Sequence, residues 1–414
     1  MHMNKKEKIT LVPKLRFSEF NKEDAWEKTS ISNYLHESKV KGNKGDTARK
    51  LTVKLWGQGV FEKKETLNGS ENTQYYRRKS GQFIYSKLDF LNQAFGIIPD
   101  HLDGYESTVD LPCFDISENI NARFLLEYVQ RPSFYKRYGE MADGGRKARR
   151  IQVDSFLGFP VYTPNLKEQK KIADCLHSLD DLIHAEGKKL EALKAHKKGL
   201  MQKLFPSGDK TFPEWRFPEF KDSKEWKSKT IGRSCVSFSG GTPDTSNKAY
   251  YNGSIPFIRS GEIKKNTTEL FITQEGFDNS SAKMVRIGDV LVALYGANSG
   301  EVSLSKVDGA INQAILCLQH ETNNAFLYHY LSHKKNWIIT TYIQGGQGNL
   351  SGELVKSIEL YFPEPEEQQK IADCLSSLDE RITAQMEQIE ALHAHKEGLM
   401  QGLFPSPSIE EAGE

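Results

Sequence analysis

Cysteine is scarce and irregularly spaced in this sequence. The five cysteines are odd in number, lie far apart and never form a Cys-x-x-Cys pair. This spacing argues against a disulfide framework and against a zinc site built on paired cysteines. We therefore expect a reduced, cytoplasmic protein with no metal site.

Long hydrophobic runs and an excess of charge of either sign are also missing. No apolar run approaches the ~20 residues that span a bilayer, so no membrane association is expected. The first residues, "MHMNKKEKIT", lack the apolar core of a secretory signal. With 56 basic and 55 acidic residues the net charge is +1. A nucleic-acid-binding surface would therefore have to be assembled locally.

Two catalytic signatures are absent as well. The chain has no Pro-Pro pair, so it lacks the Asn/Asp-Pro-Pro-aromatic segment of adenine methyltransferases. It has no G-x-x-x-x-G-K-[ST] phosphate loop. These absences argue against a methyltransferase or a phosphate-loop nucleotidase.

What the sequence does contain is a long internal repeat. "EQKKIADCLHSLDDLI" at 168–183 returns as "EQQKIADCLSSLDERI" at 367–382. Residues 164–207 and 363–406 are identical at 28 of 44 aligned positions. The unit is domain-sized, which excludes a solenoid of short repeats. The chain is therefore predicted to be two halves, each a variable domain followed by a near-constant segment.

The constant segments have the periodicity of long helices. Apolar residues recur about every 3.5 positions from Ile172 to Leu204 and from Ile371 to Leu403, a pattern typical of a coiled coil. Each helix should start after a proline, Pro164 or Pro363, and stop before another, Pro206 or Pro405. We expect the two helices to pair antiparallel; the alternative is that each packs only on its own domain.

The variable domains mix strand-like and helical stretches, which predicts two α/β (α+β) domains. "GDVLVALYGANSG" at 288–300 indicates a buried strand followed by a glycine-rich loop, and "GQFIYSKLDFLNQAFGII" at 81–98 takes the matching place in the first half. "GAINQAILCLQ" at 309–319 indicates another strand. The expected division is 1–163, 164–206, 207–362 and 363–405, with a tail at 406–414.

Basic residues alternate with aromatic and polar ones at three places. They are "YYRRKSGQF" at 75–83, "GGRKARR" at 144–150 and "IPFIRSGEIKK" at 255–265. Arg and Lys together with Ser, Asn, Gln and Tyr commonly contact DNA phosphates and base edges. Taken singly, each stretch is equally compatible with a solvated surface.

Together these features resemble the specificity (S) subunit of type I restriction–modification systems, the HsdS family. The resemblance rests on the duplicated order of variable domain, proline, Glu-Gln, "KIADCL.SLD" and "GLMQ.LFP", and on "GGQGNLSGELVKSIELYFPEPEEQQKIADCL" at 345–375. "SGGTPDTSN" and "IPFIRSGEI" also look like loops of that family's second domain. In the first half, "GRKARRI" replaces "GQGNLS".

The resemblance implies a non-catalytic DNA reader in a bacterial or archaeal cytoplasm. Two target-recognition domains would each read one half of a bipartite, asymmetric site in double-stranded DNA. The paired helices would set the unread spacer and dock two methyltransferase subunits, and restriction/translocase subunits would complete the complex. S-adenosylmethionine, ATP and Mg²⁺ would belong to those partners, and this chain would bind no cofactor.

The candidate site residues follow from the loops and the repeat. For DNA contact we predict, in the first domain, Arg77, Arg78, Lys79, Lys87, Arg146, Lys147 and Arg149. In the second domain we predict Gly240, Gly241, Thr242, Arg259, Ser260, Tyr295, Asn298, Ser299, Gln347 and Asn349. For methyltransferase docking we predict Gln169, Asp180, Gln368 and Asp379.

Two other functions stay open at this point. A scaffold carrying two protein-binding domains on a coiled-coil strut would explain the repeat. A metal-dependent nuclease would use Pro243-Asp244 with Glu262 to Lys264, which formally match a PD…ExK pattern. A scaffold should show no salt-dependent DNA affinity, and a nuclease should cut DNA with Mg²⁺ alone.

Overall fold

In the computed structural model the chain forms two compact units, and each includes parts of both long helices. Unit 1 comprises residues 1–185 and 389–414, and unit 2 comprises residues 186–388. The structure describes residues 10–64, 70–140, 150–207, 210–342 and 349–405. Among these residues no helix combines the length and the hydropathy that a membrane span requires.

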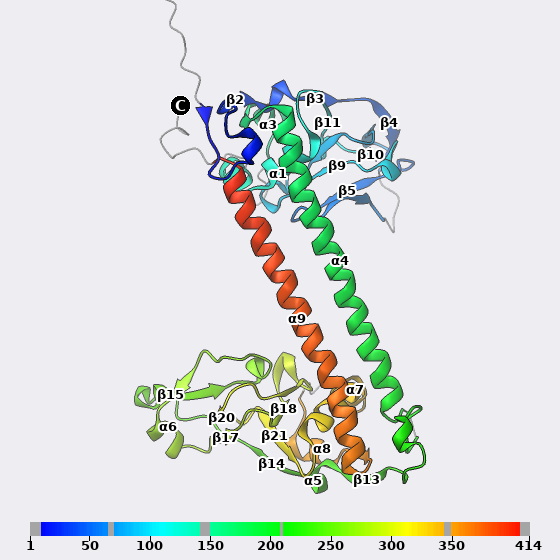
Figure 1. Cartoon of the computed structure of the whole chain (residues 1–414), viewed down its shortest axis with the longest axis vertical. Coiled ribbons are helices and arrows are strands. Elements are labelled where there is room, and N and C mark those ends of the chain that lie inside the picture. The colour runs from blue at the N-terminus through cyan, green and yellow to red at the C-terminus, as the bar shows by residue number, and fades with distance from the viewer. Residues whose placement is uncertain (1–9, 65–69, 141–149, 208–209, 343–348, 406–414) are drawn as a thin grey trace, which may run out of the picture. The chain divides into compact units, whose positions relative to one another are not determined.

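The two long helices are where the repeat predicts them. Helix α4 (Leu166–Leu204) and helix α9 (Pro365–Leu403) have 39 residues each, about 58 Å at 1.5 Å per residue. Figure 1 shows α4 in green and α9 in orange to red. Proline suits the first turn of α9, because the amide N–H it lacks has no helical partner there.

The predicted seam is confirmed in both helices. Every seam position from 172 to 204 and from 371 to 403 is buried or half-buried, whereas most positions between them are exposed. In unit 1 the start of α4 and the end of α9 share one core, and in unit 2 the end of α4 and the start of α9 share another. Within each unit the two helix segments therefore pair antiparallel.

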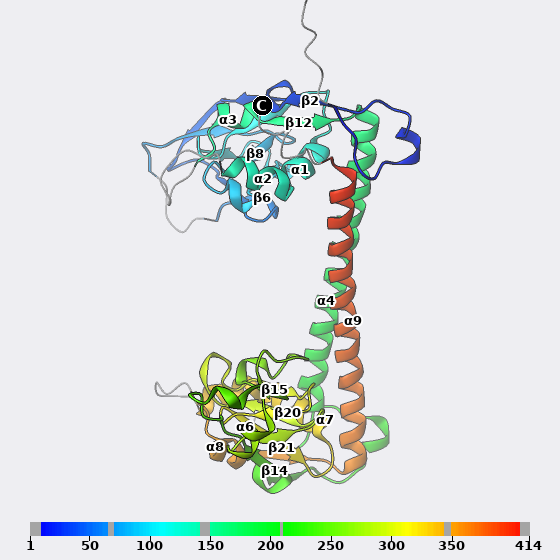
Figure 2. The same ribbon diagram turned by 90° about the vertical axis from the view of Figure 1, so that its left-hand side faces the viewer.

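Besides the long-helix segments, the described residues of unit 1 form four small sheets and three short helices. The sheet orders are β1-β2-β12, β10-β7-β4, β3-β11-β8-β9 and β5-β6; Figure 2 shows β2 and β12 together. The strands are β1 Thr10–Leu11, β2 Trp26–Ser30, β3 Leu35–Ser38, β4 Lys41–Lys44, β5 Leu51–Lys54, β6 Gly59–Glu62, β7 Gln74–Arg77, β8 Phe83–Tyr85, β9 Phe95–Ile97, β10 Glu106–Ser107, β11 Cys113–Ile116 and β12 Pro160–Thr163. The helices are α1 Ala122–Gln130, α2 Pro132–Gly139 and α3 Val153–Gly158, with 3₁₀ turns η1 Ser18–Phe20, η2 Ile31–Asn33, η3 Phe90–Asn92 and η4 Asp100–Leu102.

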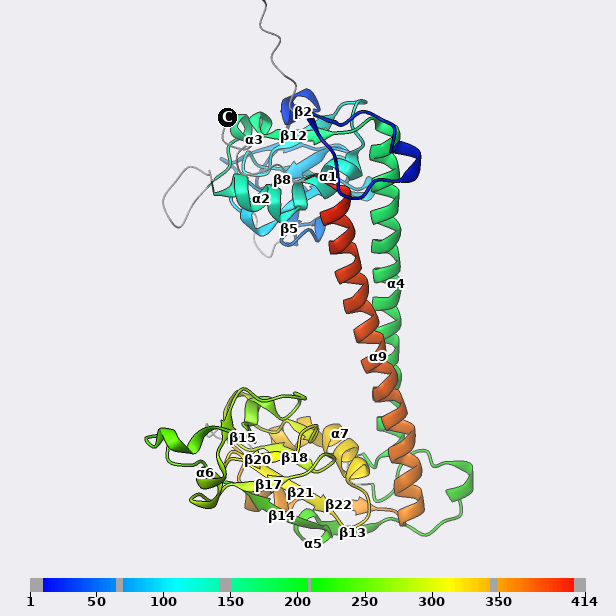
Figure 3. The ribbon, with the colours of Figure 1, turned by 60° about the vertical axis from the view of Figure 1, so that its left-hand side comes forward.

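Besides the long-helix segments, the described residues of unit 2 form three sheets and four helices. The orders are β13-β22, β14-β21-β18-β19 and β16-β15-β20-β17, and Figure 3 shows β14, β21 and β18 next to one another. The strands are β13 Lys227–Thr230, β14 Cys235–Ser239, β15 Tyr251–Ile258, β16 Phe271–Ile272, β17 Lys283–Val285, β18 Val290–Ala293, β19 Val302–Leu304, β20 Gly309–Ile311, β21 Ile315–His320 and β22 Glu359–Phe362. The helices are α5 Ile231–Ser234, α6 Gln274–Asp278, α7 Asn324–Tyr342 and α8 Gly352–Ser357, with η5 Pro218–Phe220, η6 Lys248–Tyr250, η7 Ser260–Glu262 and η8 Gly296–Asn298.

One sheet has the same topology in both units. In β3-β11-β8-β9 and in β14-β21-β18-β19 every neighbouring pair is antiparallel. The predicted match of residues 81–98 with 288–300 is thereby confirmed, because β8 and β18 take the same place. The second sheets differ: only unit 2 has a described parallel strand pair, β15 with β20. The repeat thus extends to the domains, while their outer sheets diverge.

The single strand predicted at 309–319 is two strands. It breaks between β20 and β21 because Asn312 Oδ1 accepts a hydrogen bond from the amide of Ala314 (3.1 Å). Asparagine commonly forms such turns by bonding the backbone two residues ahead. The break lies next to the loop that follows β18, because the amide of Leu294 donates to Ala314 O (2.8 Å).

Candidate nucleic-acid interface

Several of the predicted loops of unit 2 meet at one end of the β14-β21-β18-β19 sheet. The amide of Leu294 donates to Ala314 O (2.8 Å), and the amide of Leu350 donates to Leu294 O (2.9 Å). Asn349 Oδ1 accepts from the amide of Gly296 (3.2 Å). The loops after β18, after β20 and before α8 are therefore tied together, although they lie far apart in the sequence.

Thr242 and the two glycines before it join the same group. Thr242 donates from Oγ1 to Gln313 Oε1 (2.7 Å). A Cβ at Gly240 would lie 1.7 Å from Ile311 O, and one at Gly241 would lie 1.8 Å from Ser281 Oγ. Both glycines are thus required by close packing against neighbouring segments of the chain, which holds Thr242 at the edge of the group.

The η7 turn, which starts at Ser260 directly after Arg259, lies beside the loop after β18. A Cβ at Gly261 would lie 3.5 Å from Asn298 Nδ2. Tyr295 is 41% exposed, and Asn298 is exposed as well. We call the residues 240–242, 259–262, 294–299, 312–314 and 349–350 the loop cluster. It brings together every predicted DNA-contact residue of unit 2 except Gln347, which lies outside the described residues.

Not every member of the loop cluster offers a free side chain. Ser299 is half-buried and donates from Oγ to Leu294 O (2.9 Å). Arg259 is 41% exposed along its side chain but pairs with the carboxylates of Glu262 (3.0 Å) and Glu269 (2.7 Å). Thr242, Tyr295, Asn298, Gln313 and Asn349 carry exposed polar groups, so these five residues and Arg259 are able to contact a ligand.

Three further residues of this region were missed from the sequence. Gln313 lies beside Thr242, and Lys264 and Lys335 both pair with Glu301. Lys264 follows directly after the predicted turn and could have been included from its position. Lys335 lies on α7, about 70 positions further along, so only the fold brings it to Glu301.

The carboxylates of the nuclease pattern have separate partners. Asp244 Oδ1 accepts from the amide (2.9 Å) and hydroxyl (2.8 Å) of Ser246, and Glu262 pairs with Arg259. Within the described ranges no cluster of three or more His, Cys, Asp or Glu side chains could hold a metal ion. These contacts give the PD…ExK alternative no support.

In unit 1 the predicted arginines 77 and 78 have opposite surroundings. Arg77 is exposed at the end of β7, opposite Glu106 of β10. Arg78 is 2% exposed and donates to Ser107 Oγ (2.8 Å) and Ser38 O (2.7 Å). Burial lowers the pKa of the Arg78 guanidinium. Arg78 therefore holds the domain together, and it is not available for DNA.

The remaining predicted cations of unit 1 are spread out. Lys79 is exposed, and Lys87 is half-buried with its backbone bonded to Asp110 and Ile151. Arg146, Lys147 and Arg149 lie outside the described residues. Two exposed lysines that were not predicted, Lys41 and Lys44, lie on β4, which pairs with β7. The basic stretch "KVKGNKGDTARK" at 39–50 is the sequence signal that could have found them.

The two glutamines predicted for partner docking are buried inside their own units. Gln169 is 2% exposed, accepts from the amide of Asn121 (2.9 Å) and donates to Pro164 O (2.9 Å). Gln368 is 3% exposed, accepts from Thr322 Oγ1 (2.6 Å) and donates to Pro363 O (2.9 Å). Both glutamines lock a domain onto the first turn of its helix, and neither is accessible to a partner.

The two predicted aspartates pair across the helices. In unit 1, Lys396 Nζ contacts Asp180 Oδ2 (2.7 Å) and Glu127 Oε1 (3.2 Å). In unit 2, Lys197 Nζ contacts Asp379 Oδ1 (2.5 Å). The side chains of Asp180 and Asp379 remain 43% and 35% exposed. They stay accessible at the surface of the helix pair, unlike the glutamines.

Parts of the chain are similar in sequence to known proteins. A family model described as "Type I restriction modification DNA specificity domain" matches residues 223–393. The putative MjaX specificity subunit of Methanocaldococcus jannaschii is 25% identical over 67% of this chain and 65% of its own length. The EcoR124I/EcoR124II specificity subunit of Escherichia coli is 26% identical over 39% of this chain and 42% of its own length. The chain thus aligns with less than two thirds of either relative.

The whole fold also has solved counterparts. The type I S subunit from M. genitalium superposes with a TM-score of 0.64 at 14% identity, over 96% of this chain and 100% of that one. A chain from a study of type I restriction–modification complex assembly gives 0.56 at 15% identity, over 92% and 97%. Residues 223–393 thus match a type I restriction modification DNA specificity domain, and the chain as a whole is similar in fold to specificity subunits of type I restriction–modification systems.

Proposed function

We propose that this chain is the non-catalytic DNA-reading subunit of a type I adenine methyltransferase and restriction complex. Each unit reads one half of a bipartite, asymmetric site in double-stranded DNA. The observation that carries this proposal is the loop cluster of unit 2, where polar side chains from five separate segments meet at one end of a sheet. Such convergence of loops on a rigid sheet is typical of binding sites.

The composition of the loop cluster suits DNA better than a small molecule or a protein. Arg259, Asn298, Asn349 and Gln313 are the side-chain types that pair with guanine and adenine edges in the major groove. Thr242 and Tyr295 add hydroxyl groups, and Lys264, which pairs with Glu301, adds a cation after the η7 turn. A second basic and aromatic surface on β4 and β7 of unit 1, with Arg77, Lys41 and Lys44, serves the other half-site.

The two long helices set the spacer between the half-sites and dock two methyltransferase subunits. Support for a defined register comes from the polar seam positions, where Gln385 donates from Nε2 to Glu186 Oε2 (2.6 Å) in unit 2. The repeat gives the chain two similar surfaces for two copies of one partner. Because Gln169 and Gln368 are buried, the docking surface is assigned to the exposed faces around Asp180 and Asp379. S-adenosylmethionine, ATP and Mg²⁺ are assigned to the methyltransferase and restriction/translocase subunits.

The decisive experiment is to co-express the chain with the methyltransferase encoded beside it and to map modified adenines across a genome by long-read sequencing. One bipartite motif with a constant gap, lost when the chain is omitted, is the expected result. Methylation that is unchanged without the chain would favour the scaffold alternative instead. Cutting of DNA by the purified chain with Mg²⁺ alone would instead support the PD…ExK nuclease alternative.

The spacer role has its own test. One heptad is inserted after Lys188 in α4 and another after Gln388 in α9, positions that the ion-pair register places opposite each other. Seven residues lengthen each helix by about 10 Å, which corresponds to about three base pairs at 3.4 Å. The gap should grow by that amount while both half-sites stay the same. A change in half-site sequence would show that the helices do more than set the distance.

A further inference from the structure

Arg259 is held by two glutamates that use different parts of its guanidinium group. It donates from Nε to Glu262 Oε2 (3.0 Å) and from Nη2 to Glu262 Oε1 (3.0 Å). Nη2 also donates to Glu269 Oε2 (2.7 Å). Glu262 is 4% exposed, whereas the side chain of Glu269 is 72% exposed. One glutamate is therefore part of the folded domain, and the other lies at the surface.

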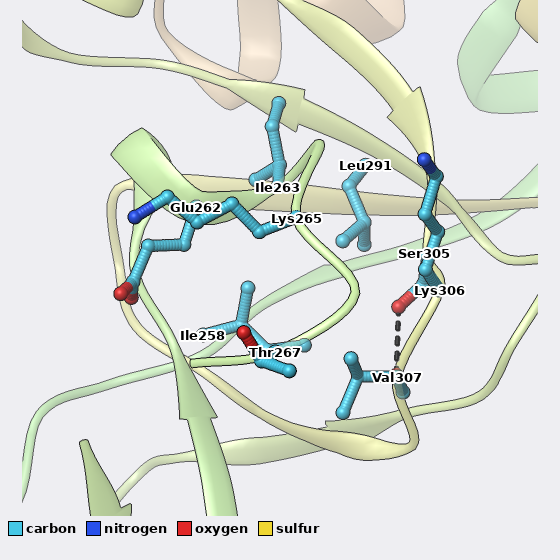
Figure 4. Close-up of a pocket in the computed structure, with 9 residues that line it drawn as sticks. All are labelled: Ile258, Glu262, Ile263, Lys265, Thr267, Leu291, Ser305, Lys306 and Val307. Atoms are coloured by element: carbon cyan, nitrogen blue, oxygen red, sulfur yellow. Dashed lines mark hydrogen bonds between the residues drawn. The ribbon is translucent and has the colours of Figure 1, made fainter. Parts of the chain in front are cut away.

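Glu262 is itself fixed from several directions. Its carboxylate accepts from Thr268 Oγ1 (3.2 Å), from the amide of Glu269 (3.2 Å) and from the amide of Arg259 (3.3 Å). In Figure 4 this carboxylate points away from Leu291 and Val307, the apolar side of the neighbouring pocket. The Arg259 guanidinium lowers the pKa of Glu262 to about 2, so the group is ionised at neutral pH.

A count of donors shows what remains for a ligand. A guanidinium has five N–H groups: one on Nε and two on each Nη. Glu262 takes the Nε–H and one Nη2–H, and Glu269 takes the second Nη2–H. Among the described residues Nη1 makes no hydrogen bond. If Glu269 moved away, one Nη1–H and one Nη2–H would be free. These two donors point in parallel from the Nη1–Nη2 edge of the guanidinium, the edge that Glu262 does not occupy.

Glu269 has another partner available when it withdraws. Lys265 Nζ lies 3.7 Å from Glu269 Oε1, so the carboxylate can keep an ion pair after it leaves Arg259. Glu262 cannot leave in the same way, because it is buried and bonded to the backbone. Arg259 thus has one permanent partner, Glu262, which orients it, and one removable partner, Glu269, which occupies its exposed N–H group.

We propose that Glu262 is the positioning residue that orients Arg259 to read a guanine through its Nη1–Nη2 edge, and that Glu269 covers this edge until DNA displaces it. The proposal rests on the DNA-reading function above and assigns it a specificity-determining residue. Guanine presents two acceptors, O6 and N7, to a paired donor in the major groove. A preformed donor edge recognises that pair without ordering a long side chain at the moment of binding.

The test uses the full chain in complex with its methyltransferase and compares three glutamine variants. Glu262→Gln should weaken the preference for one guanine of a half-site about tenfold or more, because the donor edge is no longer oriented. Glu269→Gln should keep the motif and tighten binding several-fold. Glu275→Gln, an exposed position on α6, makes the same change of charge away from Arg259 and should leave the guanine preference unchanged.

A further variant, Arg259→Lys, tests the proposal even if the Glu262→Gln protein does not fold. It keeps the charge but has no donor fork, so methylation should continue at sites where that guanine is replaced. Unchanged guanine preference in both Glu262→Gln and Arg259→Lys would overturn the proposal. An equal loss of affinity for all sequences would assign Arg259 to a phosphate and would overturn it too.

A measurement without DNA separates this inference from the proposed function. Labelling of arginines by phenylglyoxal, followed by mass spectrometry, should modify Arg259 slowly in the wild type and several-fold faster in Glu262→Gln. Equal labelling rates would show that Glu262 does not orient Arg259, whatever the chain binds. A wild-type complex that yields no motif would instead overturn the DNA-reading function and the base-reading role together.

Discussion

Lys396 Nζ lies 2.7 Å from Asp180 Oδ2, between the α4 and α9 segments of unit 1. Lys197 and Asp379 form the same contact in unit 2 (2.5 Å). Each copy of the repeat supplies one aspartate and one lysine, and each pair joins residues of different copies. The duplicated sequence is therefore self-complementary when its two copies run antiparallel.

This reciprocity predicts how charge exchange should act in unit 2. Asp379→Lys alone places two cations together and should lower the free energy of unfolding by about 1 kcal/mol. Lys197→Asp added to it should restore most of that loss, because the pair is formed again in reverse. Thermal unfolding of the four proteins of the cycle measures the coupling. Strictly additive effects would mean that the contact contributes nothing to the pairing.

A second pair of equivalent contacts joins each domain to the first turn of its helix. Arg16 donates from Nε (2.8 Å) and Nη2 (2.7 Å) to Glu168, which is 1% exposed. Arg216 binds Glu367 in the same way. Glu168→Ala should destabilise unit 1 by about 3–5 kcal/mol, because it leaves a guanidinium unpaired next to the core.

The matched control for that prediction is an exposed pair between the η1 turn and the start of the same helix. Glu19 and Lys171 lie 3.1 Å apart but are about half exposed, so Glu19→Ala should change stability by less than about 0.5 kcal/mol. Hydrogen exchange at residues 122–130 and 160–176 reports the local effect. If Glu168→Ala and Glu19→Ala lost similar stability, the burial of Glu168 would not be the reason for its effect.

Neighbouring arginines should give opposite phenotypes. Arg78→Met leaves Ser38 O and Ser107 Oγ without their donor and should destabilise unit 1 by about 3 kcal/mol. Arg77→Ala should leave unfolding unchanged while DNA affinity falls and the slope of log affinity against log salt decreases by about one. Chemical unfolding and DNA titration at several salt concentrations separate the two. A stability loss in the Arg77 variant would contradict its exposed position.

Unit 2 should lose stability on mild acidification. Burial lowers the pKa of His329 to about 3 and those of His320 and His333 to about 4. Around His329, Ser376 Oγ lies 3.1 Å from Nε2 and Asp379 Oδ2 lies 3.8 Å from Nδ1. The latter distance is too long for a hydrogen bond, so burial dominates.

The sign follows from where the protons bind. Between about pH 6.5 and 4 the unfolded chain binds protons at these histidines while the folded unit does not, so stability falls as the pH falls. His329 alone should account for about 2 kcal/mol between pH 7 and pH 5. His329→Gln should reduce the pH dependence of hydrogen exchange in α7 by that amount. The same dependence in both proteins would assign the acid sensitivity to other groups.

The helices were predictable because their information is local. A seam with a 3.5-residue period and prolines at both ends fixes the type, the length and the buried face of α4 and α9 without reference to anything else. The seam positions Glu186 and Gln385 are polar, and the hydrogen bond between them fixes the register of the two helices in unit 2. The strand and glycine-rich loop at 288–300 were recognised for the same reason, since alternation, burial and glycine all act within a few residues.

The candidate site was predicted less completely. Arg77 and Arg78 look alike in the sequence, but adjacent residues of an extended chain point to opposite faces, so one is exposed and the other is buried. Gln169 and Gln368 look like surface polar residues at a helix start, yet each bonds a loop of its own unit. Such differences depend on which segment packs against which, and no local pattern carries that information.

By itself the sequence determined that this protein has two related halves, two long helices and neither the methyltransferase nor the phosphate-loop signature, because repeats, periods and missing motifs are properties of the chain alone. Only the tertiary structure decided which polar residues can meet a ligand. Arg259, Glu262 and Glu269 acquire separate roles because burial fixes one carboxylate and leaves the other in water. Whether a carboxylate orients Arg259 or only occupies its exposed N–H group depends on how deeply that carboxylate is buried, and burial is established only by folding.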